Sequence, residues 1–218
     1  ENYCKPKQII KSTDDTIENS YINYDGCHYI NDWALENNIA HKGHALTWPS
    51  PSKYPDWYEE ITDADVLEEH TIDYIIEVMN EMGELYAWDV VNEAISNSDA
   101  VYLKDNVLTP VDDYVCLAFT TARAVRDANG WDTILFYNEY DFESDQGDFT
   151  VKSDKVLELM TDMVDRDCGV DAVGFQTHID LSYSDENIQG IKNNFDAYAD
   201  LGLYVQISEI DVRCGKGE

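Results

Sequence analysis

The stretch Trp88-Asp89-Val90-Val91-Asn92-Glu93-Ala94 decides the fold, because a short apolar run passes directly into an amide and a carboxylate. A second stretch, Val205-Gln206-Ile207-Ser208-Glu209-Ile210-Asp211, ends in the same way. Apolar runs of this length, rich in β-branched residues and without strict alternation, are typical of strands buried on both faces. Polar side chains directly behind such strands predict a functional site at one end of a parallel sheet.

Apolar runs of this kind recur along the chain, at 39–48, 85–91, 133–137, 172–176 and 203–207. Apolar residues at helical spacing predict helices between them. Thr62-Asp63-Ala64-Asp65 predicts a helix start, with a hydroxyl as the cap, and Gly130 and Gly202 predict helix ends. Alternating strands and helices indicate parallel strands joined by right-handed crossovers, either in a doubly wound sheet or in a (β/α)8 barrel.

The polar strand ends separate these two folds. They are distributed over most of the predicted strands: His44 and Trp48, Asn92 and Glu93, Asn138 to Tyr140, Gln176 and His178, Glu209 and Asp211. A barrel gathers all its strand ends around one site, whereas a doubly wound sheet concentrates ligand groups at one switch point, usually with a glycine-rich turn. The sequence has no G-x-G-x-x-G motif. We therefore predict an α/β fold of the (β/α)8 TIM barrel type.

Composition limits the partners. The 218 residues are 44% hydrophobic, which favours a single domain over residues 1–218. Forty-five Asp and Glu against 14 Lys and Arg give a net charge of -31, which repels nucleic acid and anionic membranes and favours a monomer acting on a neutral polymer. No long apolar run predicts a membrane span.

The five cysteines lack C-x-x-C spacing, which argues against a zinc or redox motif. Four of them can form two disulfides, as in an extracellular protein. We expect Cys4 to pair with Cys27, and Cys214 to stay free or to pair outside this sequence.

The chemistry lies in Glu93 and Glu209. Two carboxyl groups that project from separate strands into one mouth are what retaining glycoside hydrolysis requires, at a separation of about 5–5.5 Å. Glu93 is then the general acid/base and Glu209 the nucleophile, and we expect Asn92 to donate a hydrogen bond to the 2-hydroxyl of the sugar. A lone Glu behind a strand is usually structural, and the combination of two carries the assignment.

His44 and His178 are expected to be neutral hydrogen-bonding groups in the same mouth. With the carboxylates they also suggest a metal-dependent hydrolase, but the close histidine spacing of metal sites is missing. We therefore expect neither a metal nor another cofactor. Trp48, Trp57 and Tyr140 are candidate platforms on which a sugar ring stacks.

These motifs resemble those of family 10 glycoside hydrolases, the retaining endo-β-1,4-xylanases with a (β/α)8 fold. The matching segments follow the order of the family: Glu1 to Lys5, Gly43 to Trp48, Trp88 to Ala94, Tyr137 to Tyr140, Gly174 to His178 and Ile207 to Asp211. Such a set of motifs, spread over nearly the whole chain, is specific.

The resemblance implies roles for further residues. His178, bridging toward Asp211, tunes the surroundings of the nucleophile. Asn2 and Lys5 bind sugar on the glycone side, His44, Trp48 and Gln176 lie nearer the cleavage point, and Tyr140 faces the leaving-group side. The sequence departs from the family at Pro49 and Pro51, where His and Gln are frequent, and at Asp141, where Asn is frequent.

The resemblance also implies that Glu1 closes the second strand of the barrel. The first strands and the last strand would then be lacking, and we expect a partial sequence, attached to other modules or completed by another segment. Three functions stay open: a secreted endo-acting enzyme that cleaves xylan, a β-glycanase acting on another β-1,4-glycan, and a non-catalytic hydrolase-like module of an extracellular assembly.

Overall fold

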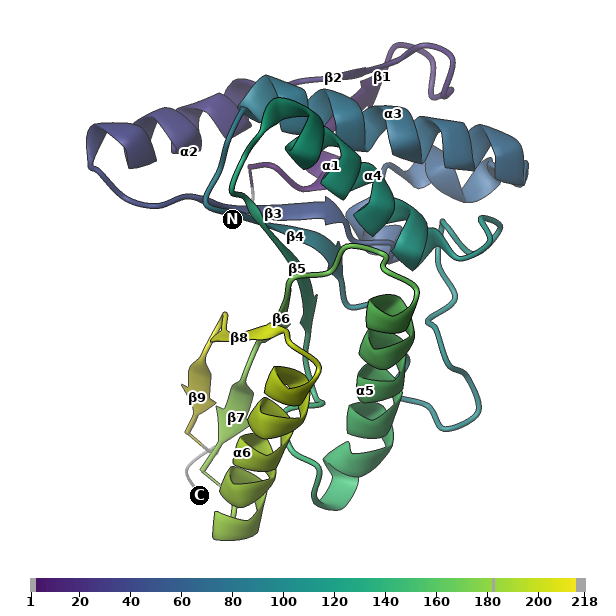
Figure 1. Cartoon of the computed structure of the whole chain (residues 1–218). Helices are drawn as coiled ribbons and strands as arrows, with labels where there is room; N and C mark the ends of the chain where they lie inside the picture. The colour runs from purple at the N-terminus through teal and green to yellow at the C-terminus, as the bar shows by residue number, and fades with distance from the viewer. Residues whose placement is uncertain (1–2, 182, 215–218) are drawn as a thin grey trace. The chain divides into compact units, whose positions relative to one another are not determined.

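The computed structural model describes residues 3–181 and 183–214 (Figure 1). The chain divides into two compact units. The first comprises Glu1–Asn92 and Asp105–Leu135, and the second comprises Glu93–Lys104 and Phe136–Glu218. His44 and Trp48 therefore belong to the first unit, and Glu93 and Glu209 to the second.

The first unit is built around the parallel pair of strands β3 and β4. Its elements are α1 (Pro6–Ile9), β1 (Ile10–Ser12), β2 (Ser20–Ile22), α2 (Asp25–Glu36), β3 (Lys42–Thr47), the 3-10 helices η1 (Pro51–Lys53) and η2 (Asp56–Glu60), α3 (Ala64–Met82), β4 (Ala87–Asn92) and α4 (Tyr114–Asn129). Strands β1 and β2 form an antiparallel hairpin. Helices α3 and α4 lie side by side (Figure 1).

Strand β4 is buried over its whole length, as its run of apolar residues predicts. Its Trp88 pairs in register with Gly43 of β3, and a Cβ atom at Gly43 would collide with the Trp88 ring. Glycine is therefore needed at this position so that the indole can pack against the neighbouring strand. The buried strand ends at Asn92, directly before Glu93.

The predicted helix boundaries are largely confirmed, with one correction at α3. The cap is the Asp63 carboxylate, which accepts hydrogen bonds from the backbone N–H groups of Asp65 and Val66 at 3.1 and 3.3 Å, and not a Thr62 hydroxyl. An acidic cap interacts better with the positive end of the helix dipole than a hydroxyl does. Helix α4 ends at Gly130 with φ +69°, and Gly202, with φ +82°, follows the last residues of α6 (Asp185–Asp200).

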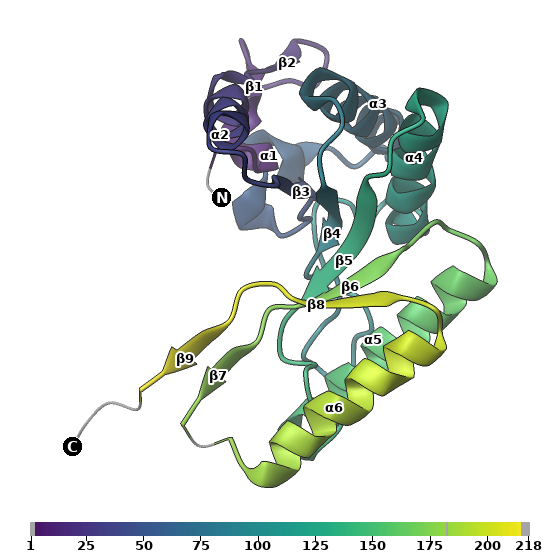
Figure 2. The ribbon, with the colours of Figure 1, turned by 60° about the vertical axis from the view of Figure 1, so that its left-hand side comes forward.

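The second unit continues the strand–helix alternation. Strand β5 (Ile134–Glu139) begins in the first unit and enters the second, where it is followed by η3 (Gly147–Phe149), α5 (Thr150–Asp165), β6 (Ala172–Phe175), β7 (His178–Asp180), α6, β8 (Tyr204–Ile207) and β9 (Asp211–Arg213). Strand β6 pairs in parallel with both β5 and β8. Helices α5 and α6 pack against each other, and α6 also packs along β8 (Figures 1 and 2).

Two short strands extend the ends of β6 and β8. The β6–β8 pairing ends at Phe175 and Ile207, and it resumes in β7 and β9 at His178 and Asp211 (Figure 2). Two residues separate the paired segments on one side and three on the other, so the second strand carries one extra residue, as in a β-bulge. Glu209 is in the middle of these three residues. Bulges of this kind commonly redirect a side chain next to an active site.

The strand predictions are confirmed for β3, β4, β5, β6 and β8, with shifts of a few residues at their ends. The strands β1, β2, β7 and β9 were not predicted, because three residues are too few to show a pattern. No helix in the described residues is long and apolar enough to cross a membrane.

The cysteines behave as predicted. Cys4 and Cys27 form a disulfide with Cα atoms 5.1 Å apart. Cys116 and Cys168 are also disulfide-bonded. Cys214 is a free, exposed thiol.

Candidate active site

Glu93 follows strand β4 in a left-handed backbone conformation, with φ +59°. Its backbone N–H donates to the carbonyl of Asn138 at 2.9 Å, which holds this turn against the end of β5. The carboxylate Oε1 accepts a hydrogen bond from Gln176 Nε2 at 3.1 Å, and Oε2 lies 3.9 Å from Lys104 Nζ. A non-glycine residue in this backbone region costs free energy and is common at functional sites.

Glu209 lies in the bulge between β8 and β9 and is held from two sides. Asn138 Nδ2 donates to its Oε1 at 2.8 Å, and Asn138 Oδ1 in turn accepts from the Ser208 hydroxyl at 2.6 Å. On the other side, His178 Nε2 lies 3.6 Å from Glu209 Oε2. The side chain is 27% exposed, so the carboxylate is oriented by the protein and still open to a substrate.

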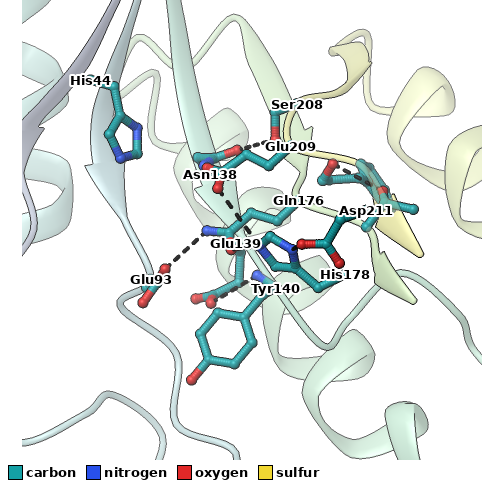
Figure 3. A network of polar contacts seen from close by, with 12 residues as sticks. His44, Glu93, Asn138, Glu139, Tyr140, Gln176, His178, Ser208, Glu209 and Asp211 are labelled. Atoms are coloured by element: carbon teal, nitrogen blue, oxygen red, sulfur yellow. Dashed lines mark hydrogen bonds and ion pairs between the residues drawn. The ribbon is translucent and has the colours of Figure 1, made fainter. Parts of the chain in front are cut away.

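Gln176 and His178 connect the two glutamates within the second unit (Figure 3). Gln176 Nε2 donates to Glu93, and Gln176 Oε1 faces His178 Nε2 at 3.1 Å. His178 also contacts Glu209 through Nε2 and, through Nδ1, Asp211 Oδ2 at 2.9 Å. The chain of contacts therefore runs from Glu93 through Gln176 and His178 to Glu209.

Oxygen atoms surround the His178 ring. Asp211, Gln176 and Glu209 all present oxygen acceptors to it. The tautomer of the ring decides which of these oxygens receives a hydrogen bond from Nδ1 or from Nε2.

A buried ion pair between Glu139 and Lys152 supports the loop that carries Glu93. Glu139, at the end of β5, is fully buried and lies 2.9 Å from Lys152 Nζ of α5. Its Oε2 also accepts from the Tyr137 hydroxyl at 2.8 Å and from the Ile95 N–H at 3.0 Å. Because Ile95 follows Glu93 by two residues, this carboxylate fixes the start of the loop that carries the acid/base candidate.

A second buried carboxyl group, Glu143, holds the segment that carries Gln176 and His178. It accepts the backbone N–H of Thr177 at 2.8 Å, and Thr177 has φ +59° between Gln176 and His178. Burial raises the pKa of Glu143, and the backbone hydrogen bonds to its carboxylate oppose that rise. Gln176 and His178 therefore flank Thr177, whose backbone is held by the buried carboxyl group of Glu143.

Tyr140 is half-buried and surrounded by cations. Lys152 Nζ lies 3.6 Å and Lys104 Nζ 4.6 Å from the ring centroid, and Lys104 Nζ also donates to the hydroxyl at 3.3 Å. Burial raises the pKa of the Tyr140 hydroxyl, and Lys152 acts against it. Lys104 thus contacts both Tyr140 and Glu93, a link that the sequence analysis did not identify.

The remaining predicted site residues belong to the first unit. His44 Nδ1 lies 2.8 Å from Asp89 Oδ2, and the His44 ring packs edge-on against Trp48 with centroids 5.5 Å apart. The ammonium group of Lys5 lies 4.6 Å from the centroid of the Trp48 ring. Asn92 is buried at the end of β4, and Asn2 lies outside the described residues. Within this unit, His44 and Lys5 both contact the Trp48 ring.

The structure thus gathers Glu93, Gln176, His178, Glu209 and Asp211 in one network of the second unit (Figure 3). Asn138 lies at a predicted strand end to which no role was assigned, and Ser208 and Lys152 were not among the predicted site residues. Only the position of Asn138, one residue before Glu139 at a polar strand end, signalled its importance. Among the described residues, no group of three or more His, Cys, Asp or Glu could hold a metal ion.

Comparison with known proteins identifies the family. The model of glycosyl hydrolase family 10 matches residues 1–218. The endo-beta-1,4-xylanase Xyn10C of Cellvibrio japonicus is 34% identical over 194 residues, covering 83% of this chain and 30% of the relative. The endo-1,4-beta-xylanase B of Neocallimastix patriciarum is 31% identical over 218 residues, covering 98% of this chain and 23% of the relative.

Solved structures agree. Native xylanase10C from Cellvibrio japonicus superposes with a TM-score of 0.82 and 30% identity, over 97% of this chain and 42% of that one. The GH10 xylanase from Bispora sp. MEY-1 has a TM-score of 0.84 at 24% identity, over 98% of this chain and 62% of that one, and shows the likeness of the fold alone. The chain spans less than two thirds of the length of each of these relatives.

The predicted fold class, an incomplete (β/α)8 barrel, is confirmed. The structural neighbours are (β/α)8 barrels, and the part of the chain that the structure describes contains five strands of the parallel series, β3, β4, β5, β6 and β8, with helices between them. By sequence and by structure, this chain belongs to glycosyl hydrolase family 10.

Proposed function

We propose that residues 1–218 are a single catalytic domain of an endo-β-1,4-xylanase that cleaves xylan with retention of configuration. The observation that carries this proposal is the contact chain from Glu93 through Gln176 and His178 to Glu209 in one compact unit. It joins two glutamates that end different strands, as a double-displacement mechanism requires. The relatives named above, which are endo-xylanases, support xylan as the substrate.

In the first step, Glu93 protonates the oxygen of the leaving sugar while Glu209 attacks the anomeric carbon, and a covalent glycosyl-enzyme forms. The hydrogen bond from Asn138 and the nearby His178 hold the Glu209 carboxylate in a fixed direction. In the second step Glu93, now ionised, removes a proton from water, which attacks the same carbon. We expect the carboxyl groups of Glu93 and Glu209 to lie about 5–5.5 Å apart.

The hydrogen bond from Gln176 fits both states of Glu93. Its amide nitrogen donates to the ionised carboxylate, and after a rotation its oxygen can accept from the protonated acid. The other end of the amide faces His178. Each rotation therefore also changes whether the oxygen or the nitrogen of Gln176 faces the imidazole ring. We propose that Gln176 thereby accommodates the alternation of Glu93 between acid and base.

We further propose that the protein is secreted and acts as a monomer. The disulfides support an oxidising compartment, and the net charge of -31 disfavours self-association. The strongly acidic chain is also suited to a neutral polymer such as xylan.

The direct test is a screen of the purified protein on xylan, cellulose and mannan, with the reducing ends and the size of the products as readouts. Endo-cleavage of xylan in preference to the other two polymers supports the proposal. Preferred cleavage of cellulose or mannan would assign a different β-1,4-glycan. Binding of xylan without hydrolysis would assign a non-catalytic module.

A further inference from the structure

A groove of about 550 Å³ lies in the first unit, and its lining includes Trp57, one of the candidate sugar platforms noted from the sequence. One wall comes from α1 and the β1 hairpin and the other from η2. We call it the Trp57 groove, and its main lining residues are Lys7, Lys11, Asp15, Asp56, Trp57 and Glu60. Its volume falls within the roughly 300–1,000 Å³ of sites that bind small ligands.

The two walls are joined, and each has internal links. Lys7 of α1 forms an ion pair of 2.7 Å with Asp56 of η2 across the groove. The Cys4–Cys27 disulfide anchors the chain just before α1. In the hairpin, the Ser12 hydroxyl donates to the Thr16 carbonyl at 2.8 Å and accepts the Thr16 N–H at 3.1 Å. The groove therefore exists before any ligand binds.

The lining has the chemistry of a sugar site. Trp57 offers an aromatic surface, and the polar groups around it can donate to or accept from hydroxyl groups. Two lysines face three carboxylates, so the groove has almost no net charge. This balance favours a neutral polyhydroxyl ligand and disfavours a phosphate or a uronic acid.

The chain segments that line the groove are next in sequence to residues that contact Trp48. Lys5 and Lys53 both place their ammonium groups over the Trp48 ring, at 4.6 and 4.2 Å from its centroid. The groove begins two residues beyond each of them, at Lys7 and at Pro55. A linear glycan that contacts Trp48 can thus extend toward the groove within the same compact unit.

We propose that the Trp57 groove binds a further neutral sugar unit of a xylan chain. This inference rests on the proposed function. The unit bound there adds to the affinity for polymer and takes no part in bond cleavage.

The test compares the wild type with Trp57→Ala on polymeric xylan and on an aryl xylobioside too short to fill additional sites. Loss of one stacked aromatic ring should raise KM for xylan about tenfold. The kcat on xylan and the kcat/KM on the aryl xylobioside should stay unchanged. Trp33→Ala is the matched control, because Trp33 is a half-exposed tryptophan of the same unit outside the groove.

Trp57 also packs on Tyr58, with ring centroids 4.6 Å apart, so Glu60→Ala serves as a second variant that removes only an exposed rim group. It should raise KM for xylan roughly threefold. Wild-type KM in both Glu60→Ala and a folded Trp57→Ala overturns the proposal, as does equal loss on both substrates. If the wild type hydrolyses no glycan, the proposed function fails. Binding to the groove is then tested by retardation of the protein in xylan-containing gels. The proposal requires that retardation decreases in Trp57→Ala and stays unchanged in Trp33→Ala.

Discussion

Asn138 uses both ends of its amide to orient the Glu209 carboxylate. The nitrogen donates to Glu209 at 2.8 Å and the oxygen accepts from Ser208 at 2.6 Å. Gly174 on the neighbouring strand makes room, because a Cβ atom there would collide with Asn138 Oδ1. The direction of one carboxylate thus depends on residues from β5, β6 and the bulge after β8.

Asn138→Ala should therefore lower kcat on xylan and leave KM nearly unchanged. A hydrogen bond to a charged group contributes about 1.5–3 kcal/mol, which corresponds to a loss of roughly 10- to 100-fold if it acts fully in the transition state. Steady-state kinetics measure the effect. Asn193→Ala is the control, because it removes an amide–carboxylate bond to Asp145 on the surface of the same unit. A kcat within a factor of about two of wild type for Asn138→Ala would contradict the positioning role.

The catalytic candidates were predictable from the sequence because each stands directly behind a strand. Gln176 and His178 were named as site residues through the family resemblance. Their contacts with Glu93 and Glu209 were not predictable, because parallel strands bring residues 83 apart in sequence together. The buried pair Glu139–Lys152 was also missed, since nothing in the local pattern shows that a helix lysine will point into the core.

At the scale of elements, short apolar runs predicted the five parallel strands, and apolar residues at helical spacing predicted the long helices between them. It could not predict the bulge that carries Glu209. The extra residue between β8 and β9 follows from how β6 and β7 pair with them, and pairing register is a tertiary property. The same holds for the left-handed backbone of Thr177, which Glu143 stabilises through a hydrogen bond.

The Cys4–Cys27 disulfide closes a loop with a sequence separation of 23 that contains α1 and the β1–β2 hairpin. Closing a loop of this size restricts the unfolded chain and contributes about 3 kcal/mol. Cys4→Ala combined with Cys27→Ala should lower the free energy of unfolding by about that amount, as measured by urea unfolding. Cys214→Ala, which removes the free exposed thiol, should leave stability unchanged. Equal stability of the double variant and the wild type would show that the disulfide does not stabilise this segment.

At the scale of the whole molecule, the match to glycosyl hydrolase family 10 covers the entire chain. The sequence predicted this fold because polar residues at several strand ends suit a barrel and not a sheet with one switch point. It also predicted the Cys4–Cys27 pairing. The separation of the contacts into two compact units was not predicted, because it depends on packing and leaves no change of composition at residues 92 or 135.

The stability of the molecule should depend on pH through Glu143. Burial raises its pKa in the folded protein above the ordinary value of 4.5. The stabilisation from the protonated form is then complete below the pKa of the unfolded chain and is lost as the pH rises through the folded pKa. Glu143→Gln escapes this loss, and its amide oxygen can still accept the Thr177 N–H.

Urea unfolding at pH 4 and pH 7 measures the effect. The free energy of unfolding of Glu143→Gln, relative to that of the wild type, should be higher at pH 7 than at pH 4. Glu68→Gln, at an exposed position of α3, should show no such trend. A difference between Glu143→Gln and wild type that is the same at both pH values would contradict the raised pKa.

The central claim is that Glu93 is the acid/base and Glu209 the nucleophile, and Glu93→Ala tests it most directly. A general acid contributes about 10²–10⁴-fold when the leaving group is poor, so the variant should lose that much on xylan. With an activated aryl xylobioside the glycosylation step needs little protonation and should be far less affected. Deglycosylation should be slow, because no base activates water.

Added azide needs no base, and it should therefore restore turnover of the aryl xylobioside by Glu93→Ala. Because azide attacks the covalent intermediate on Glu209, the product should be a xylobiosyl azide with the anomeric configuration of the substrate. Glu209→Ala, which cannot form that intermediate, should stay inactive on every substrate in the retaining mechanism. Azide rescue of Glu93→Ala with the retained product is the result that the assignment predicts. Equal impairment of Glu93→Ala on xylan and on the aryl xylobioside, with no response to azide, would contradict it.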